Sequence, residues 1–391
     1  MTASAGDDLS AARETGEMPV LGPGQLPARV VVIGTGLIGT SIALALRERD
    51  VDVWLADADY AAVLLAANLG AGQPLPADGL PDGLPDGQAD VAVLAVPPAA
   101  VATELRTAQS RGLARAYTDV ASVKELPLAA ARELGCDLAS YLPGHPLSGR
   151  ERSGPAAARA DLFVGRPWVL CPQPANDTTT IRLGTGLAEA CGALPVAVPS
   201  ADHDQWVALV SHAPHVVAAA MAARLEGAPE DALALAGQGL HDVTRIAASG
   251  SGMWLQILTA NAGPASAVLR SVAADLAGAA DALANLAAGD EQAVKYVADL
   301  LERGSAGVRR IPGKHGGPTR DFAAVQVVIP DRPGELARLF RVAEDAGINI
   351  EDVSIEHSPG LPVGVAELWV RPETVAELSG VLAAGGWPVR R

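Results

Sequence analysis

Short apolar runs alternate with helical patterns along the first half of the chain. The run RVVVI starts at Arg29, and a glycine-rich turn, a helical stretch and a second apolar run, VDVWLA, follow it. Two later runs, DVAVLAV from residue 90 and ARAYTDVAS from residue 114, are further strand candidates. Alternation of this kind predicts βαβ units and an open, mostly parallel sheet of the doubly wound type over residues 29–200.

The pattern changes twice in the second half. From residue 201, apolar residues recur at helical spacing with almost no strand runs, which predicts a helical domain over residues 201–303. Gly, Pro and basic residues then gather in a predicted linker over residues 304–320. In residues 321–391 the order strand, helix, strand, strand, helix, strand predicts a small α+β domain. Residues 1–28, ahead of the first strand, are predicted to be a disordered tail.

Composition excludes several classes of partner. The 45 acidic and 29 basic residues give a net charge of −16, which opposes binding to nucleic-acid phosphates. The three cysteines lie far apart without CxxC spacing, so we expect neither a disulfide framework nor a zinc site. The acidic first segment does not have the pattern of a signal peptide, and later apolar runs are interrupted before the roughly 20 residues that a membrane span needs. We therefore predict a cytoplasmic protein that binds neither nucleic acid nor membrane.

Gly34, Gly36 and Gly39 form a GxGxxG motif directly after the first strand and at the start of a helix. In this context the glycines allow a tight turn, close approach of a pyrophosphate and helix–strand packing, which predicts a Rossmann-type dinucleotide site. Asp57 follows 18 residues after Gly39, where a carboxylate accepts a ribose hydroxyl and repels the 2′-phosphate of NADP. NAD is therefore the predicted cofactor. Further cofactor contacts are predicted at Leu37, Ile38, Val96 and Pro97, although the proline after Val96 is equally an ordinary strand end.

Four polar segments are candidates for the chemistry beyond the cofactor. They are TDVASVK at 118–124, PGHPLSGRERSG at 143–154, SHAPH at 211–215 and the segment around Arg245. His145 is suited to proton abstraction, although a histidine beside a strand is more often structural. His212 and His215 lack the carboxylate of a metal motif, so we favour substrate binding and predict no metal. Arg245 is suited to binding a carboxylate, although an arginine on a helix is more often part of a surface ion pair.

These segments, in this order, resemble the prephenate and arogenate dehydrogenase family of tyrosine biosynthesis. The matching segments are VVIGTGLIGTSIALAL, TDVASVK, LPGHPLSGRERSG, SHAPH and DVTRIAASGSGMW, which run from Val31 to Trp254. The resemblance implies NAD-dependent oxidative decarboxylation of prephenate to 4-hydroxyphenylpyruvate, and a homodimer formed by the helical domain. IPDRPGELARLF and GINIEDVSIE resemble an ACT domain, a ferredoxin-like module that binds amino acids. This second resemblance implies an amino-acid effector, with tyrosine as the candidate, and places Gly334 in the turn that would line its site. The alternative is that the domain only helps the chain to oligomerise.

The resemblance also implies a role for each site residue. His145 accepts the proton of the ring hydroxyl, and Ser122 orients His145 and contacts the same hydroxyl. Arg245 holds the ring carboxylate, and His215 contacts the pyruvyl side chain, with His212 as its substitute. The other residues implied around the substrate are Glu151, Asp242 and Trp254, of which the tryptophan closes the pocket. Lys124 and Asp119 are predicted to form a structural ion pair.

Three other functions stay open at this point. Arogenate, which carries an amine where prephenate has a keto group, is the second substrate candidate. A β-hydroxyacid dehydrogenase also joins a dinucleotide domain to helices. Such an enzyme would carry a catalytic lysine in the helical part, but Lys295 lies outside the matched segments. A non-catalytic regulator that senses an amino acid and the redox state is disfavoured by the joint presence of His145, Ser122 and Arg245.

Overall fold

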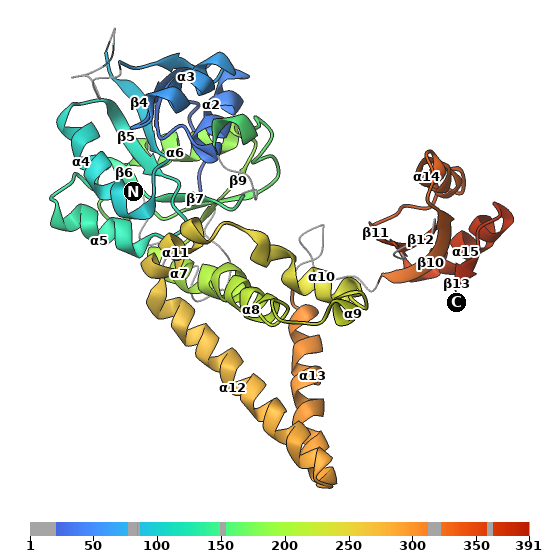
Figure 1. Cartoon of the computed structure of the whole chain (residues 1–391). Coiled ribbons are helices and arrows are strands. Elements are labelled where there is room, and N and C mark those ends of the chain that lie inside the picture. The colour runs from blue at the N-terminus through green and yellow to red at the C-terminus, as the bar shows by residue number, and fades with distance from the viewer. Residues whose placement is uncertain are drawn as a thin grey trace. The chain divides into compact units, whose positions relative to one another are not determined.

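The computed structural model describes residues 21–76, 84, 87–148, 154–311, 322–357 and 363–390. The chain falls into two units, Met1–Ser271 and Val272–Arg391. Figure 1 labels their helices and strands along the chain.

A six-stranded parallel sheet forms the centre of the first unit, in the order β3-β2-β1-β4-β5-β6. Its strands are β1 (Arg29–Ile33), β2 (Asp52–Ala56), β3 (Gln73–Pro74), β4 (Ala89–Leu94), β5 (Ala114–Asp119) and β6 (Tyr141–Leu142). Val30, Val31 and Val32 of β1 are fully buried, because a central parallel strand is covered on both faces. The strand order reverses between β1 and β4, which places a topological switch point at their carboxyl ends. The predicted doubly wound domain is confirmed.

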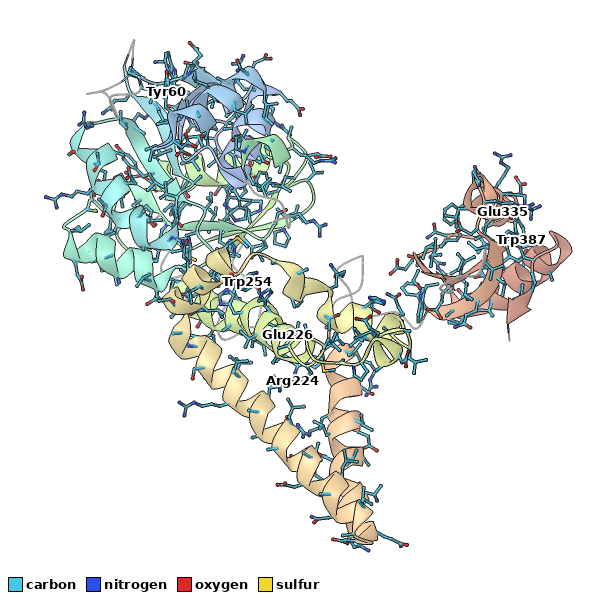
Figure 2. The ribbon with its side chains drawn as sticks, viewed as in Figure 1. Tyr60, Arg224, Glu226, Trp254, Glu335 and Trp387 are labelled. Atoms are coloured by element: carbon cyan, nitrogen blue, oxygen red, sulfur yellow. The ribbon has the colours of Figure 1, made fainter. Side chains whose placement is uncertain are left out.

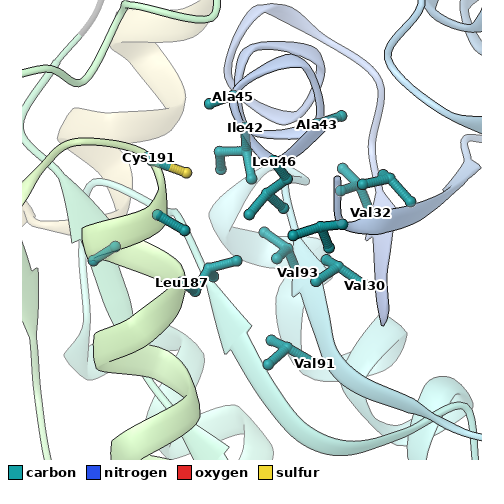
Figure 3. Close-up of a cluster of buried hydrophobic side chains, with 14 of the residues drawn as sticks. Val30, Val32, Ile42, Ala43, Ala45, Leu46, Val91, Val93, Leu187 and Cys191 are labelled. Carbon is teal, nitrogen blue, oxygen red and sulfur yellow. The ribbon is translucent and has the colours of Figure 1, made fainter. Parts of the chain in front are cut away.

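Helices cover both faces of this sheet. One face carries α2, α3 and α6 and the other carries α4 and α5. Their bounds are α2 (Leu37–Arg47), α3 (Tyr60–Asn68), α4 (Val101–Ser110), α5 (Glu125–Glu133) and α6 (Thr178–Ala190). Asp59 and Asp177 start α3 and α6, because each side chain accepts a main-chain N–H of the first turn. Figure 3 shows Leu46 of α2, Leu187 of α6 and Val93 of β4 in one buried cluster.

A separate three-stranded sheet follows, in the order β7-β8-β9. Its strands are β7 (Gly144–Pro146), β8 (Pro167–Leu170) and β9 (Leu194–Ala197). β7 runs antiparallel to β8, and β8 runs parallel to β9. The sequence predicts one mostly parallel sheet up to residue 200, so the separate sheet corrects that prediction. Strands of three and four residues are too short to show a period that would have separated them.

Residues 21–28 run against α6 within the first unit, which corrects the predicted tail over its described part. The main-chain N–H of Gln25 donates to the carbonyl of Arg182 at 2.8 Å. A Cβ on Gly186 would lie only 2.0 Å from the carbonyl oxygen of Gln25, so the missing side chain is what lets this segment run against α6. Residues 1–20 of the predicted tail lie outside the described residues.

Helices make up the chain from residue 200 to residue 308. Their bounds are α7 (Ser200–Val207), the π-helix η3 (Ala208–His212), α8 (Ala213–Ala222), α9 (Glu230–Leu233), α10 (Gln238–Thr244), η4 (Arg245–Ala248), α11 (Ser251–Ala260), α12 (Ala262–Ala287), η5 (Glu291–Ala293) and α13 (Val294–Val308). α12 continues from the first unit into the second. α13 ends at Val308, so residues 304–308 of the predicted linker are helical. In the described ranges no helix is both long and apolar enough to cross a bilayer.

The C-terminal part of the second unit is a four-stranded antiparallel sheet in the order β11-β12-β10-β13. Its elements are β10 (Ala323–Pro330), α14 (Glu335–Asp345), β11 (Asp352–His357), β12 (Val363–Val370), η6 (Pro372–Thr374), α15 (Val375–Ala384) and β13 (Val389–Arg390). The βαββαβ order matches the ferredoxin-like expectation. Trp387 Nε1 donates to the buried carboxylate of Glu335 at 3.1 Å, and both residues are labelled in Figure 2.

Candidate active site

The glycine-rich loop lies at the switch point of the parallel sheet. The N–H of Gly34 donates to the carbonyl of Ala56 at 2.7 Å, at the end of β2. Gly34 has a φ of +104°, and a Cβ there would lie 2.2 Å from the carbonyl oxygen of Ala95, just after β4. The loop therefore lies between the ends of three neighbouring strands. Only glycine both adopts the positive φ of Gly34 and leaves room for the carbonyl of Ala95.

The start of α2 offers unpaired amides beside open space. Gly36 is the N-cap and makes no side-chain cap, and no acceptor in the described part of the chain meets the amides of Gly36, Leu37 and Ile38. A Cβ on Gly36 would contact nothing within 4 Å. Unpaired N–H groups at a helix N-terminus bind phosphate, so the residues present fit a dinucleotide.

Asp57 is held beside this loop by three hydrogen bonds. Its Oδ2 accepts the amide of Thr35 at 2.6 Å and the Thr35 hydroxyl at 3.1 Å, and its Oδ1 accepts the amide of Asp59 at 2.9 Å. The carboxylate is half-buried, and its role as a ribose acceptor stays a prediction. Val96 is half-buried and Pro97 is exposed at the start of the single-turn helix η1 (Pro98–Ala100), so their cofactor contacts remain predictions.

The three glycines predict different outcomes for two alanine variants. A Cβ on Gly39 would lie 1.9 Å from the carbonyl oxygen of Gly34, so Gly39→Ala is expected to destabilise the protein by about 1–3 kcal/mol and to weaken dinucleotide binding. Gly36→Ala is expected to keep the wild-type melting temperature and to weaken binding about tenfold, because its methyl group enters the space that the pyrophosphate needs. Thermal unfolding and fluorescence titration with NAD measure both effects. Equal melting temperatures for the two variants would contradict this packing argument.

His145 lies at the centre of β7 and forms a hydrogen-bonded chain with two residues of α7. Its Nδ1 lies 2.9 Å from Nε2 of His203, and Nδ1 of His203 lies 2.8 Å from Oδ1 of Asp204. Asp204 also accepts the main-chain amides of Lys124 at 2.8 Å and Glu125 at 2.9 Å. A main-chain loop of the nucleotide-binding domain therefore fixes the carboxylate that ends this chain.

The chain of hydrogen bonds sets the tautomer of His145. Burial raises the pKa of Asp204, but hydrogen bonds from His203 and two main-chain amides outweigh it and leave that pKa below its ordinary value. The ionised Asp204 only accepts, so His203 carries its proton on Nδ1 and accepts through Nε2. His145 must then donate from Nδ1, which leaves its Nε2 as a proton acceptor. Burial, followed by the neighbouring His203 and Lys124, lowers the pKa of His145 well below its ordinary value and keeps the ring neutral.

The predicted ion pair between Lys124 and Asp119 is present and completely buried. Lys124 Nζ donates to Oδ1 of Asp119 and to the carbonyl of Gly144, the residue before His145. Asp119 also accepts the hydroxyl of Tyr141 at 2.7 Å. The pair therefore joins the end of β5 to the strand that carries the candidate base.

His212 and His215 lie beside Trp254, at and just after a π-helix. The rings of Trp254 and His215 stack with centroids 3.6 Å apart, and Trp254 meets His212 edge-on at 6.2 Å. Figure 2 labels Trp254, which belongs to α11. Burial lowers the pKa of His212 to about 4 and also lowers that of His215, so both rings are neutral at pH 7. π-Helical turns occur frequently at functional sites.

The structure brings together only part of the predicted substrate site. Arg245 and Asp242 are exposed, and within the described ranges no ion pair or hydrogen bond joins Arg245 to His145 or His215. Its helix η4 packs against α8, which carries His215. Asp242 accepts the side chain of Gln238 at 2.7 Å. Glu151 lies outside the described residues.

Among the described residues no hydrogen bond joins Ser122 to His145, so the orienting role of Ser122 stays a prediction. Ser122 is half-buried in the loop after β5, and the described hydrogen bonds give His145 the partner His203 instead. The sequence interpretation missed His203 and Asp204. The signal for them was the DHD segment at the start of α7, where a histidine and an aspartate are adjacent. Among the described residues, no three His, Cys, Asp or Glu side chains gather as metal ligands do.

A dinucleotide loop at the switch point, together with the hydrogen bonds that join His145 of β7 to His203 and Asp204 of α7, defines a dinucleotide-dependent oxidoreductase. Residues 42–196 match the nucleotide-binding domain of prephenate dehydrogenase, and residues 199–298 match its dimerization domain. The probable prephenate dehydrogenase NovF of Streptomyces niveus is 40% identical over 363 residues, which cover 92% of this chain and 98% of NovF. The chain belongs to the prephenate dehydrogenase family.

Solved structures agree with this assignment. The prephenate dehydrogenase of Aquifex aeolicus, in complex with hydroxyphenyl propionate and NAD+, is 25% identical with a TM-score of 0.61 and covers 71% of this chain and 97% of its own. The arogenate dehydrogenase of Synechocystis is 25% identical with a TM-score of 0.59 and covers 72% of this chain and 98% of its own. Relatives named for either substrate share the fold, so the substrate has to be argued from the site.

Proposed function

We propose that the protein is an NAD-dependent prephenate dehydrogenase that forms 4-hydroxyphenylpyruvate and carbon dioxide. The observation that carries the proposal is the chain from Asp204 through His203 to His145, which leaves Nε2 of His145 as a neutral proton acceptor. The family reaction needs such a group, because the ring hydroxyl loses its proton as the C–H bond beside it breaks.

The chain's own residues handle the proton and the carboxylate. The glycine loop and Asp57 would hold NAD, which would supply the hydride acceptor for the ring carbon that bears the hydroxyl. His145 takes the hydroxyl proton at Nε2, and the ionised Asp204 stabilises the resulting positive charge through His203. Arg245 holds the ring carboxylate until its bond to the ring breaks and carbon dioxide leaves. The electron pair of that bond completes the aromatic ring, and the phenolic oxygen recovers the proton from His145.

The other predicted residues take positions around the substrate in this proposal. Ser122 contacts the ring hydroxyl, His215 contacts the pyruvyl side chain, and Trp254 closes the pocket. Asp242 and Glu151 contact the residues that bind the substrate rather than the substrate itself. These assignments follow the family resemblance, and the stack of Trp254 on His215 supports the placement of those two rings together.

Asp57 supports NAD as the preferred dinucleotide. Its carboxylate accepts a ribose hydroxyl and would repel a 2′-phosphate. The assay that tests the proposal offers prephenate and arogenate side by side, each with NAD and NADP, and follows formation of the reduced cofactor by absorbance. Turnover of prephenate with NAD is the expected result. Preference for arogenate would keep the chemistry and overturn the substrate, and no turnover of either would overturn the proposal.

The pH dependence of kcat/KM tests the state of His145. The base is active only when neutral, and the burial that lowers its pKa moves its protonation to lower pH. The acidic limb of the kcat/KM profile is therefore expected below the ordinary histidine pKa of about 6.5. Steady-state rates from pH 4.5 to 8 in buffers of constant ionic strength measure it, at about half-unit steps. A limb at or above the ordinary value would contradict the neutral, buried base.

The remaining proposals concern assembly and regulation. The match to a dimerization domain supports a homodimer formed by the helical domain. The C-terminal ferredoxin-like fold, with Gly334 at φ +88° before α14, supports an ACT-like domain that binds tyrosine as an effector. Calorimetric titration of the full chain with tyrosine, phenylalanine and tryptophan tests the effector, and heat of binding from tyrosine alone is expected.

A further inference from the structure

Asn261 connects the relay, the hydrogen-bonded chain of His145, His203 and Asp204, to His212. It lies between α11 and α12 and is 2% exposed. Its Nδ2 lies 2.7 Å from the main-chain carbonyl of Asp204 and 3.0 Å from Nδ1 of His212. Asp204 is the residue whose carboxylate orients His203, so one buried amide contacts the element that carries the relay and a second imidazole.

These contacts determine which ring nitrogen of His212 carries the proton. A peptide carbonyl only accepts hydrogen bonds, so the atom of Asn261 that faces Asp204 has to be the NH₂ group. The same NH₂ group then donates to Nδ1 of His212, which accepts. A neutral His212 must carry its proton on Nε2, and no described residue occupies that nitrogen with a hydrogen bond.

His212 and His145 therefore hold opposite tautomers. His145 donates inward from Nδ1 and presents an acceptor at Nε2, whereas His212 accepts inward at Nδ1 and presents a donor at Nε2. Both are fixed by buried groups, Asp204 through His203 for one and Asn261 for the other. The histidines are thus prepared for two different tasks, one to remove a proton and one to donate a hydrogen bond.

We propose that His212 selects the keto acid over the amino acid form of the substrate, with Asn261 as its positioning residue. The inference rests on the proposed function. The Nε2–H of His212 donates to the keto oxygen of the prephenate side chain, which is an acceptor. Arogenate carries an ammonium group at that place, which only donates, so two donors would face each other. A site built to hydrogen-bond one group discriminates strongly against an analogue that lacks it.

The tautomer is tested first, without reference to activity. Full-length protein with ¹⁵N-labelled histidine gives long-range nitrogen–proton spectra in which protonated and bare ring nitrogens differ, and the His212 signals are assigned by their loss in His212→Asn. The expected result is a bare Nδ1 and a protonated Nε2 at pH 7. A proton on Nδ1, or a doubly protonated ring, would overturn the inference whether or not the protein turns over prephenate.

The selectivity is tested with Asn261→Leu, which removes the donor at similar volume. Asn285→Leu is the control, because Asn285 is exposed on α12. The ratio of kcat/KM for prephenate to that for arogenate is expected to fall at least about tenfold in Asn261→Leu, one hydrogen bond's worth, and to stay unchanged in the control. A ratio within about twofold of wild type would overturn the role of Asn261. If Asn261→Leu does not fold, the nitrogen–proton spectra of the wild-type protein decide whether His212 holds the tautomer that the inference requires. Turnover of neither substrate by wild type would refute the proposed function itself.

Discussion

Replacing His145 by asparagine is expected to lower kcat by about 10³-fold. Asparagine keeps a polar side chain on β7 but has no group that takes a proton near neutral pH. The hydroxyl proton of the substrate then has no acceptor at the position where Nε2 stands, and the chain from Asp204 through His203 ends without a base. Stopped-flow and steady-state rates with saturating prephenate and NAD measure the loss.

The matched control for this variant is His357→Asn, in the second unit. His357 belongs to β11 and has no part in the proposed chemistry, so wild-type kcat is expected. The dissociation constant for NAD is expected to stay within about twofold of wild type in both proteins, because the glycine loop and Asp57 are untouched. Near-normal turnover by His145→Asn with intact NAD binding would remove His145 from the mechanism.

The fold was predictable where the sequence repeats a strong local pattern. The β-branched run of β1, the glycine loop and Asp57 lie within 29 residues of one another, so each supports the interpretation of the next. Prediction was wrong where elements are short. β7 has three residues, and residues 21–28 form no regular element, yet Gln25 still bonds to α6. Such contacts depend on how closely two segments of backbone can approach each other. The hydrophobic periodicity of the sequence carries no information about this distance.

The site divides in the same way. His145 was identifiable because it lies among turn residues in a matched segment. His203 and Asp204 were missed because the relay joins positions 58 residues apart, and polar residues at the start of a helix look like ordinary first-turn residues. Asn261 follows α11, where asparagine is a common helix end. Only the packing of α7, α11 and β7 turns these ordinary residues into one hydrogen-bonded network.

The largest stability effect is expected from Lys124→Met. The variant keeps most of the side-chain volume and the main-chain amide that binds Asp204, but it leaves the fully buried carboxylate of Asp119 without its counter-ion. Breaking a buried ion pair from one side costs about 3–5 kcal/mol, because the remaining charge stays desolvated. Urea unfolding of the full chain, followed by circular dichroism, measures this cost as a lower transition midpoint.

The double variant Asp119→Asn with Lys124→Met separates the charge from the packing. Asparagine has no charge to desolvate, but its single oxygen accepts only one of two donors that face Asp119, the hydroxyl of Tyr141 and the main-chain amide of Ala121, so part of the lost free energy of unfolding is expected to return. The carbonyl of Gly144 loses its donor in both variants, so its contribution cancels in the comparison. The double variant could instead lose as much free energy of unfolding as the two single variants together. That result would mean that Lys124 stabilises the protein through packing and the Gly144 carbonyl, and that its charge does not stabilise the Asp119 carboxylate. Recovery would instead show that the pair is an electrostatic unit, one that fixes the strand carrying His145 while taking no proton in the reaction.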